Sequence, residues 1–458
     1  MNQALWIISL LYGIMGILYA FIGIRRIVRR NEIEIFDFVR LMYAFTYGFI
    51  PCLIYGQESS GQRNLYFFDY SSSGIQNIVA MLCLSVAAYG ILNLAYFSVP
   101  KNNRMPQKEV NVSDVDEENT SGNLITMGFI ALLIGGVSLF LWTRAYGSLS
   151  NFILNAARIR SGNGTVYNKF AFMKHFTRIL PISLYALLSG ICIGKPKKVK
   201  KVGLLILLSI SLVANYLYFM ASDSRVTILF TGIAVVAIML RHRKGRNISR
   251  YLILAGIVSF ILLELTMLAD VYTSYVKYGK WISNTDGLIS NLTKEFRFIL
   301  SSDMKVMKAW SEGSLHRKIF DDLINAIVSW IPERFVPFEI PETVWRYNTN
   351  IYHTGGSGTS PSALVSTGIY EIGLLGALIH PFILGLVTGY TDSRIKRGEA
   401  AQYGDVYYGV CVGLFIQMVS HNQISTFVGS LFPAFLFFVL TKLFSTVTIG
   451  GRRILKGS

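Results

Sequence analysis

The stretch VGLLILLSISLVANYLYFMA, Val202–Ala221, runs for twenty residues without a single charge. A helix of ~20 apolar residues crosses the ~30 Å hydrocarbon core of a bilayer. Similar stretches recur along the chain, at 4–24, 34–56, 74–97, 123–143, 176–194, 226–240, 251–270, 362–390, 403–421 and 426–445. The sequence therefore predicts an all-α, polytopic bundle of about eleven transmembrane helices, with residues 1–458 forming a single membrane domain.

The composition agrees with a membrane protein. Hydrophobic residues make up 52% of the 458 residues and charged residues only 15%, which is below the ~25% typical of soluble domains. The net charge of +17 comes from short basic clusters between the apolar stretches. A nucleic-acid groove needs one contiguous basic face, so we expect no nucleic-acid partner.

The placement of basic residues predicts the orientation. If the segment after the first span is cytoplasmic and sides alternate, the cytoplasmic segments hold 23 Lys or Arg, whereas the short outer loops 57–73, 222–225 and 422–425 hold two. Cytoplasmic loops carry this excess in membrane proteins. The sequence predicts an outer N-terminus and a cytoplasmic C-terminus.

Two outer segments, 144–175 and 271–361, are long. The second contains apolar residues at helical spacing, in one group from Leu288 to Met307 and in another at Phe320, Leu323, Ile327 and Ile331. These groups predict amphipathic helices that lie on the membrane surface or cap a cavity. The alternative is a small extracytoplasmic subdomain with its own core.

Candidate anion-binding residues are arginines of the outer side. Arg225 joins two spans almost without a loop, where a cation needs a partner such as a phosphate, and guanidinium binds phosphate in a bidentate manner. The alternatives are snorkelling to lipid headgroups or pairing with Asp223. Arg158 and Arg160 form a second candidate pair, unless they are an ordinary solvated pair, and Arg297 is a further candidate.

Candidate proton acceptors lie in or near the long outer segments. His353 belongs to the Gly-rich phrase Tyr352–Pro361, although it is equally compatible with a polar turn that has no role. Glu371 lies within the span 362–390 and needs a polar partner, for which Arg225 is a candidate. Glu295 is another carboxylate of the outer side, and His421, at the outer end of a span, either joins the same cluster or caps its helix.

Several chemistries are disfavoured. The chain has no Gly loop of the nucleotide-binding kind and no His-Glu-x-x-His phrase. Its outer segments have no Asp-x-Asp phrase and no His or Cys cluster with ligand spacing. We expect neither a metal nor another cofactor.

Three phrases, taken in order, resemble the Wzy-type polysaccharide polymerases, which share a superfamily with the O-antigen ligases. They are Tyr146-Gly with Arg158-x-Arg160, Ser222-Asp-Ser-Arg225, and Pro361-Ser with Tyr370-Glu-Ile-Gly373-x-x-Gly376. The resemblance covers roughly Thr126 to Ser430. The chain departs from the ligases in one respect: their His-Asn pair lies closer to the Glu-x-Gly phrase than His353 lies to Glu371.

The resemblance implies an enzyme of the bacterial cytoplasmic membrane that polymerises undecaprenyl-pyrophosphate-linked oligosaccharides at the outer face. It implies that the arginines and Tyr370 bind substrate, and that a chain-length-regulating co-polymerase and a flippase are partners, besides membrane lipids. The alternatives are an O-antigen-type ligase, a glycolipid flippase or other transporter, and a structural protein that organises a glycan assembly complex.

Overall fold

The computed structural model describes residues 2–30, 32–61, 71–100, 114–160, 168–194, 198–222, 225–242, 271, 274, 275, 280, 288–328, 331, 335–352, 360–396 and 403–455. Within these ranges every regular element is a helix, as predicted. The first seven helices are α1 (Asn2–Arg30), α2 (Ile35–Ala44), the π-helix η1 (Phe45–Phe49), α3 (Ile50–Ser59), α4 (Ser72–Ser98), α5 (Asp114–Arg144) and α6 (Leu149–Arg160). Next come α7 (Met173–Thr177), α8 (Leu180–Gly194), α9 (Lys198–Ala221) and α10 (Arg225–His242). The last are α12 (Leu288–Ser311), α13 (Asp321–Val328), α14 (Val344–Asn350), α15 (Leu364–Ile372), α16 (Gly376–Lys396), α17 (Gly404–Ser420) and α18 (Ile424–Leu455).

Six helical stretches are long and apolar enough to cross a bilayer: Gln3–Arg30, Ile35–Ser59, Ser73–Ser98, Asn119–Arg144, Met173–Gly194 and Val202–Ala221. Three shorter apolar helical stretches also match predicted spans: Val226–His242, Gly404–Ser420 and Phe427–Thr441. The predicted span 251–270 lies outside the described residues. The protein is a multi-pass membrane protein.

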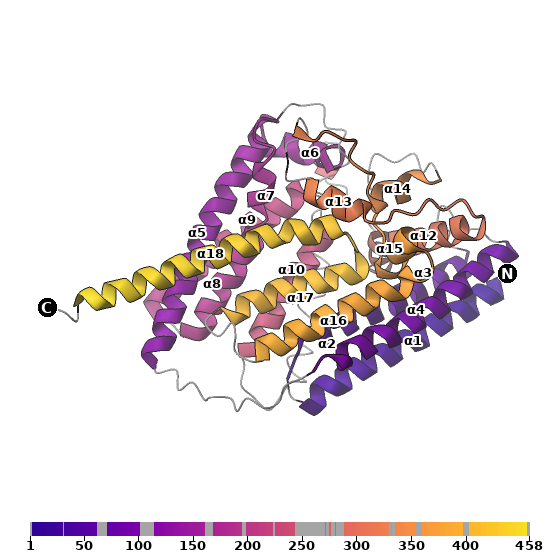
Figure 1. Ribbon diagram of the computed structural model, residues 1–458, viewed down its shortest axis with the longest axis horizontal. Helices are drawn as coiled ribbons and strands as arrows, with labels where there is room; N and C mark the ends of the chain where they lie inside the picture. The colour runs from indigo at the N-terminus through magenta and orange to yellow at the C-terminus, as the bar shows by residue number, and fades with distance from the viewer. Residues whose placement is uncertain are drawn as a thin grey trace.

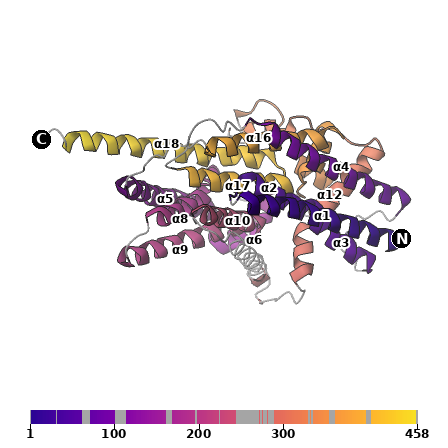
Figure 2. The ribbon, with the colours of Figure 1, turned by 90° about the horizontal axis from the view of Figure 1, so that it is seen from below.

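The long helices run roughly side by side (Figure 1), with α4, α16 and α18 along one face and α1, α2 and α17 behind them (Figure 2). The segment from α12 to α15 covers the end of the bundle at which α1 begins, which we call the capped end. At the opposite end α18 reaches beyond the other helices in both views (Figure 2). Apolar side chains cover the outside of the bundle, such as Ile17 on α1 and Val213 on α9, which are 62% and 59% exposed. Such a surface suits lipid rather than water.

The predicted single helix over 362–390 is wrong, because this segment forms two helices, α15 and α16. The chain turns at Gly373, whose φ of 85° is in the left-handed region that favours glycine. The Gly376 N–H donates to Gly373 O at 2.8 Å within this turn. Gly368 on α15 lies so close to Gly376 that neither has room for a Cβ. The glycines therefore let α15 and α16 pack backbone to backbone as a hairpin.

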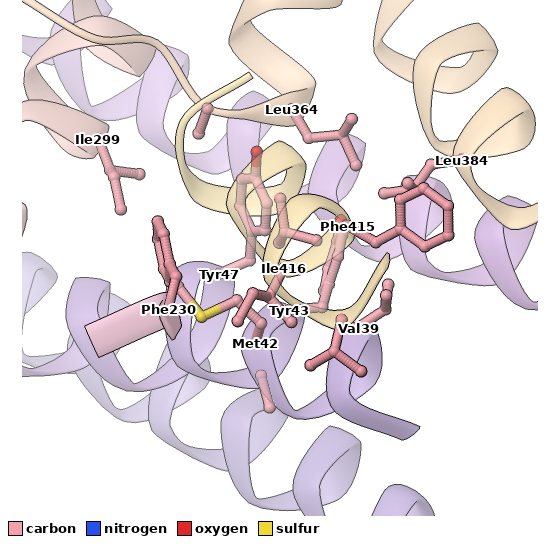
Figure 3. Packing of buried hydrophobic residues seen from close by; sticks show 14 of the residues in the cluster. Val39, Met42, Tyr43, Tyr47, Phe230, Ile299, Leu364, Leu384, Phe415 and Ile416 are labelled. Atoms are coloured by element: carbon pink, nitrogen blue, oxygen red, sulfur yellow. The ribbon is translucent and has the colours of Figure 1, made fainter. Parts of the chain in front are cut away.

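Two helices, α12 and α13, lie in the segment 271–361 where helices were predicted, and α12 belongs to the core of the whole bundle. Phe296, Leu300 and Met307 on α12 are buried in the same cluster as Tyr43 of α2. Figure 3 shows side chains of that cluster meeting from α2, η1, α10, α12, α15, α16 and α17. The alternative of a separate subdomain with its own core is therefore wrong for α12, which packs as a cap on the membrane helices.

Candidate functional site

A cavity of about 1390 Å³ opens at the capped end. Its wall is built from α7, α8, α9, α10, α17 and α18, and from the segment between Val336 and Asn350. Each membrane helix contributes the end that faces the cap: α9 its last turn and α10 its first, for example. Consecutive helices alternate in direction, so residues far apart in sequence meet at one level of the bundle.

Basic side chains line the part of this cavity that lies at the helix ends. Lys174 and His175 lie on α7, Arg178 follows that helix directly, and Arg346 lies on α14. The Arg178 guanidinium lies beside Tyr218 and packs against α18 at Gly429, where any Cβ would collide with it. Among the described residues, its buried Nη1 has no hydrogen-bond partner. This nitrogen packs against Gly429. Because Arg178 lines the cavity, its planar guanidinium is suited to bind an anion there.

Three helices begin at the same cavity. Pro181 in the first turn of α8, Val226 in the first turn of α10 and Ser425 in the first turn of α18 all line it. A helix N-terminus carries roughly half a positive charge and unpaired N–H groups, and it therefore attracts anions. Helix dipoles and cationic side chains act in the same direction here. Two carboxylates of the wall, Glu339 and Glu342, reduce the positive charge on one side.

The deeper part of the cavity is apolar. It is lined by Tyr185 on α8, by Val410 and Leu414 on α17, and by Pro433 on α18. Gln417 lines the part at the helix ends, and Val410 lies seven residues before it on α17, which corresponds to ~10 Å along the helix. The cavity is therefore amphipathic, with a cationic mouth and an apolar floor between the membrane helices.

His421 lines this cavity and is also the C-cap residue of α17. It is 8% exposed, its Nδ1 is 2.9 Å from Ser420 Oγ, and its ring centroid is 4.5 Å from that of Phe298. The rings of Phe230 and Trp345 pack around it. Aromatic packing fixes the imidazole in the cavity wall.

Arg225 is the first residue of α10, and its neighbours in the described chain, Ser222 and Val226, both line the cavity. Its backbone therefore stands at the cavity edge, although its side chain lies outside the described part. The side chains of Arg158 and Arg160, at the end of α6, and of Glu295, on α12, also lie outside the description. His353 lies outside it entirely.

Tyr370, Glu371 and Arg297 are described and are not among the residues that line the cavity. The buried Tyr370 hydroxyl donates to Asn348 Oδ1 at 2.7 Å, which ties α15 to α14. Arg297 is half-buried on α12, next to Phe298, which does line the cavity. Tyr370 thus holds the cap together instead of lining the cavity.

Glu371 is buried, and its described partner is His380 on α16, across the α15–α16 turn. His380 Nε2 is 3.0 Å from Glu371 Oε2, and His380 Nδ1 is 2.9 Å from Asn422 Nδ2. A neutral His380 that donates from Nε2 to Glu371 can accept from Asn422 at Nδ1. This chain links the hairpin to the turn between α17 and α18, directly beside His421. The sequence prediction missed His380 because only the unexpected hairpin brings it to Glu371.

Two further buried carboxyl groups belong to α12 and α13. Burial raises the pKa of the Asp303 carboxyl to about 8, and Asp303 Oδ1 has no hydrogen-bond partner in the described chain. Burial also raises the pKa of Asp322 to about 6, although its Oδ1 accepts the Val344 N–H at 2.7 Å. Neither residue lines the cavity.

No group of three or more His, Cys, Asp or Glu is placed to hold a metal ion in the described ranges. Comparison with models of known protein families, with curated proteins and with solved structures found no match. What the cavity binds is therefore inferred from its lining and its place in the bundle.

Proposed function

We propose that the protein polymerises undecaprenyl-pyrophosphate-linked oligosaccharides for a bacterial surface polysaccharide, at the outer face of the cytoplasmic membrane. The supporting observation is the amphipathic cavity at the helix ends. Its cationic mouth suits a pyrophosphate, and its apolar floor suits the first part of a prenyl chain. In this proposal the N-terminus and the capped end face outward.

The proposed reaction transfers a glycan from its lipid pyrophosphate to a hydroxyl of a second lipid-linked repeat unit. The hydroxyl oxygen forms a bond to the anomeric carbon, the bond between that carbon and the phosphate oxygen breaks, and the lipid pyrophosphate leaves with the electron pair. Arg178, Lys174 and Arg346, together with Arg225 at the cavity edge, stabilise the negative charge that develops on the leaving oxygen. The proton of the hydroxyl passes to a base. We assign this role to His421, which lies in the cavity wall.

The energy of the transfer comes from the pyrophosphate leaving group, so the proposed reaction needs no nucleotide. It also needs no divalent metal, because the cationic side chains neutralise the same charge. A ligase would use the same donor site with a different acceptor. A flippase would need the lipid to cross the bundle, and then the mouth would bind the headgroup without chemistry.

The test is a transfer assay with purified protein, a synthetic prenyl-pyrophosphate oligosaccharide and vesicles. Arg178→Ala is expected to lower the rate of chain extension by ~10²–10³-fold, the usual effect of removing one preorganised donor. Arg178→Lys is expected to recover only part of it, because Lys keeps the charge and loses the planar fork. Arg225→Ala is expected to resemble Arg178→Ala.

Arg317→Ala is the matched control, because Arg317 is exposed and stacks on Trp310 outside the cavity. A ladder of extended lipid-linked glycan supports a polymerase. Transfer to a different acceptor without extension indicates a ligase, and movement of labelled lipid between leaflets without any new bond indicates a flippase. Wild-type extension rates in Arg178→Ala and Arg225→Ala at normal protein levels would refute the proposal.

A further inference from the structure

A group of large apolar side chains is exposed on the outside of α13 and the segment after it. Ile319, Phe320, Leu323, Ile324, Ile327, Ile331, Phe335 and Phe338 are each more than a third exposed. Phe320, Phe335 and Ile327 reach 64%, 63% and 56%. On α13 the members at 323, 324 and 327 share one helical face, and Phe320 directly precedes the helix. We call these eight residues the α13 patch.

The other sides of α13 face the protein. Asp322 is fully buried and accepts the Val344 N–H, so it fixes α13 to α14. Asn325 lines the cavity and donates from Nδ2 to Pro341 O at 3.2 Å. The helix therefore forms a wall one helix thick, with the cavity on one side and the α13 patch on the other.

The α13 patch continues into a surface that already faces lipid. α13 packs against α18, and α18 has an exposed apolar stripe of its own at Leu431, Phe435 and Phe438. These three residues belong to the apolar stretch Phe427–Thr441 that matches a predicted membrane span. Two adjoining helices thus present apolar stripes to the same outside.

The backbone at Phe320 also favours a lipid environment for the α13 patch. Its φ is 62°, a left-handed conformation that is strained for a bulky side chain. Its ring is 64% exposed, so contacts with the described chain cover only a minor part of it. Burial of the ring among acyl chains would offset this strain, whereas exposure to water would add to it.

We propose that the α13 patch is inserted into the bilayer at its interface, as an extension of the lipid-facing surface of α18. A short amphipathic helix with a large apolar face lies at the boundary between headgroups and acyl chains. This position of α13 places the cationic mouth of the cavity, which lies directly behind the helix, at the level of the lipid phosphates. Under the proposed function, a lipid-linked substrate then reaches the mouth within the leaflet, and only this consequence depends on that function.

The test uses tryptophan fluorescence of the full-length protein in vesicles of phosphatidylcholine and phosphatidylglycerol. Ile327→Trp adds one indole to the α13 patch, and Ser311→Trp adds one at an exposed polar position at the end of α12. Emission of the wild type, with its six tryptophans, is subtracted from each variant. The emission added by Ile327→Trp is expected to be lost mostly in vesicles whose acyl chains are brominated near the headgroup, and to resist aqueous iodide. That added by Ser311→Trp is expected to behave in the opposite way.

Phe335→Trp repeats the measurement at a second position, in case Ile327→Trp perturbs α13. Iodide quenching of both patch variants to the extent seen for Ser311→Trp would show that the patch is in water and would overturn the proposal. Resistance of both to bromine and to iodide would show that protein covers the patch, such as a second copy of the chain, and would overturn it as well. No substrate is added, so the result is independent of the transfer assay.

Discussion

The buried pair of Glu371 and His380 offers the sharpest test of how the cap is held. The Glu371 side chain is 8% exposed and that of His380 is 11% exposed, and their oxygen and nitrogen are 3.0 Å apart. The pair spans the α15–α16 hairpin, and Asn422 continues it to the α17–α18 turn. The perturbation is Glu371→Leu, which removes the carboxylate, keeps a similar volume and leaves the imidazole without that partner.

The size of the effect follows from burial and distance. With His380 protonated, the Coulomb attraction at 3.0 Å is about 5 kcal/mol for an effective dielectric constant of ~20, before desolvation is subtracted. With His380 neutral, the contact is a hydrogen bond to a charged group that contributes ~1.5–3 kcal/mol. Removal of one partner from a buried ionic pair costs ~3–5 kcal/mol because the other remains buried and uncompensated. We expect Glu371→Leu and His380→Leu each to lower the free energy of unfolding by a few kcal/mol, within ~2–5 kcal/mol.

The double variant distinguishes this account from simple loss of packing. On this account, each single substitution destabilises the fold only because it leaves the other buried polar group without its partner. In that case the two losses of unfolding free energy do not add, and the double variant Glu371→Leu with His380→Leu recovers much of the loss. Reversible unfolding in detergent micelles, followed for all four proteins of the cycle, measures the coupling. The control cycle uses Lys308 and Glu312, an exposed pair at 3.9 Å with side chains 43% and 49% exposed, for which we expect ~0–1 kcal/mol. Additive costs at Glu371 and His380, or costs no larger than those of the control, would refute the account.

Two further predictions concern stability. Burial raises the pKa of Asp303 to about 8, so the folded state keeps a proton that the unfolded state releases near pH 4. The free energy of unfolding therefore falls by up to ~1.4 kcal/mol per pH unit as the pH rises from about 4 to 8. Between pH 6 and 8, above the range in which Asp322 contributes, Asp303→Asn is expected to remove this slope in thermal unfolding, while Asp321→Asn, at a half-buried position, keeps it; an unchanged slope in Asp303→Asn would contradict the assignment. Gly48 lies against Gly16 with no room for a Cβ, so Gly48→Ala should separate α1 from η1 and cost ~1–3 kcal/mol. Gly90→Ala, which meets open space on α4, should be neutral or slightly stabilising, and equal midpoints for the two variants would show that the close approach is unimportant.

The membrane helices were predictable because a span is a local property of the chain. Length and lack of charge located α1, α4 and α9 within a few residues. The break between α15 and α16 was not predicted, since apolar residues continue through Leu374 and Leu375. The signal that marks it is the set of glycines at 368, 373 and 376, two of which meet only when the chain has turned.

The site was predictable in part, and for the same reason. Arg225 was a predicted site residue because almost no loop separates its two spans. The described residues on either side of it line the cavity. Arg178 was overlooked because it fell within the first residues of a predicted span, where it looked like part of the helix end. His380 was overlooked because its pairing with Glu371 depends on the hairpin, which is a tertiary feature. A search for cations at the predicted outer end of each span selects Lys174 and Arg178 as well as Arg225.

The positions of the cations at the capped end argue for a ligand more strongly than their number does. Basic residues at the other end, such as Arg25 and Arg29, are accounted for by the bias that directs membrane insertion. On the orientation that the loop charges predict, that bias works against Arg178, Arg225 and Arg346, so insertion does not account for them. Three helix N-termini at the same cavity make the site still more positive, and gathering like charges in one place is unfavourable. A bound anion would remove this cost, and under the proposed function the anion is the pyrophosphate of a lipid whose chain lies against the apolar floor.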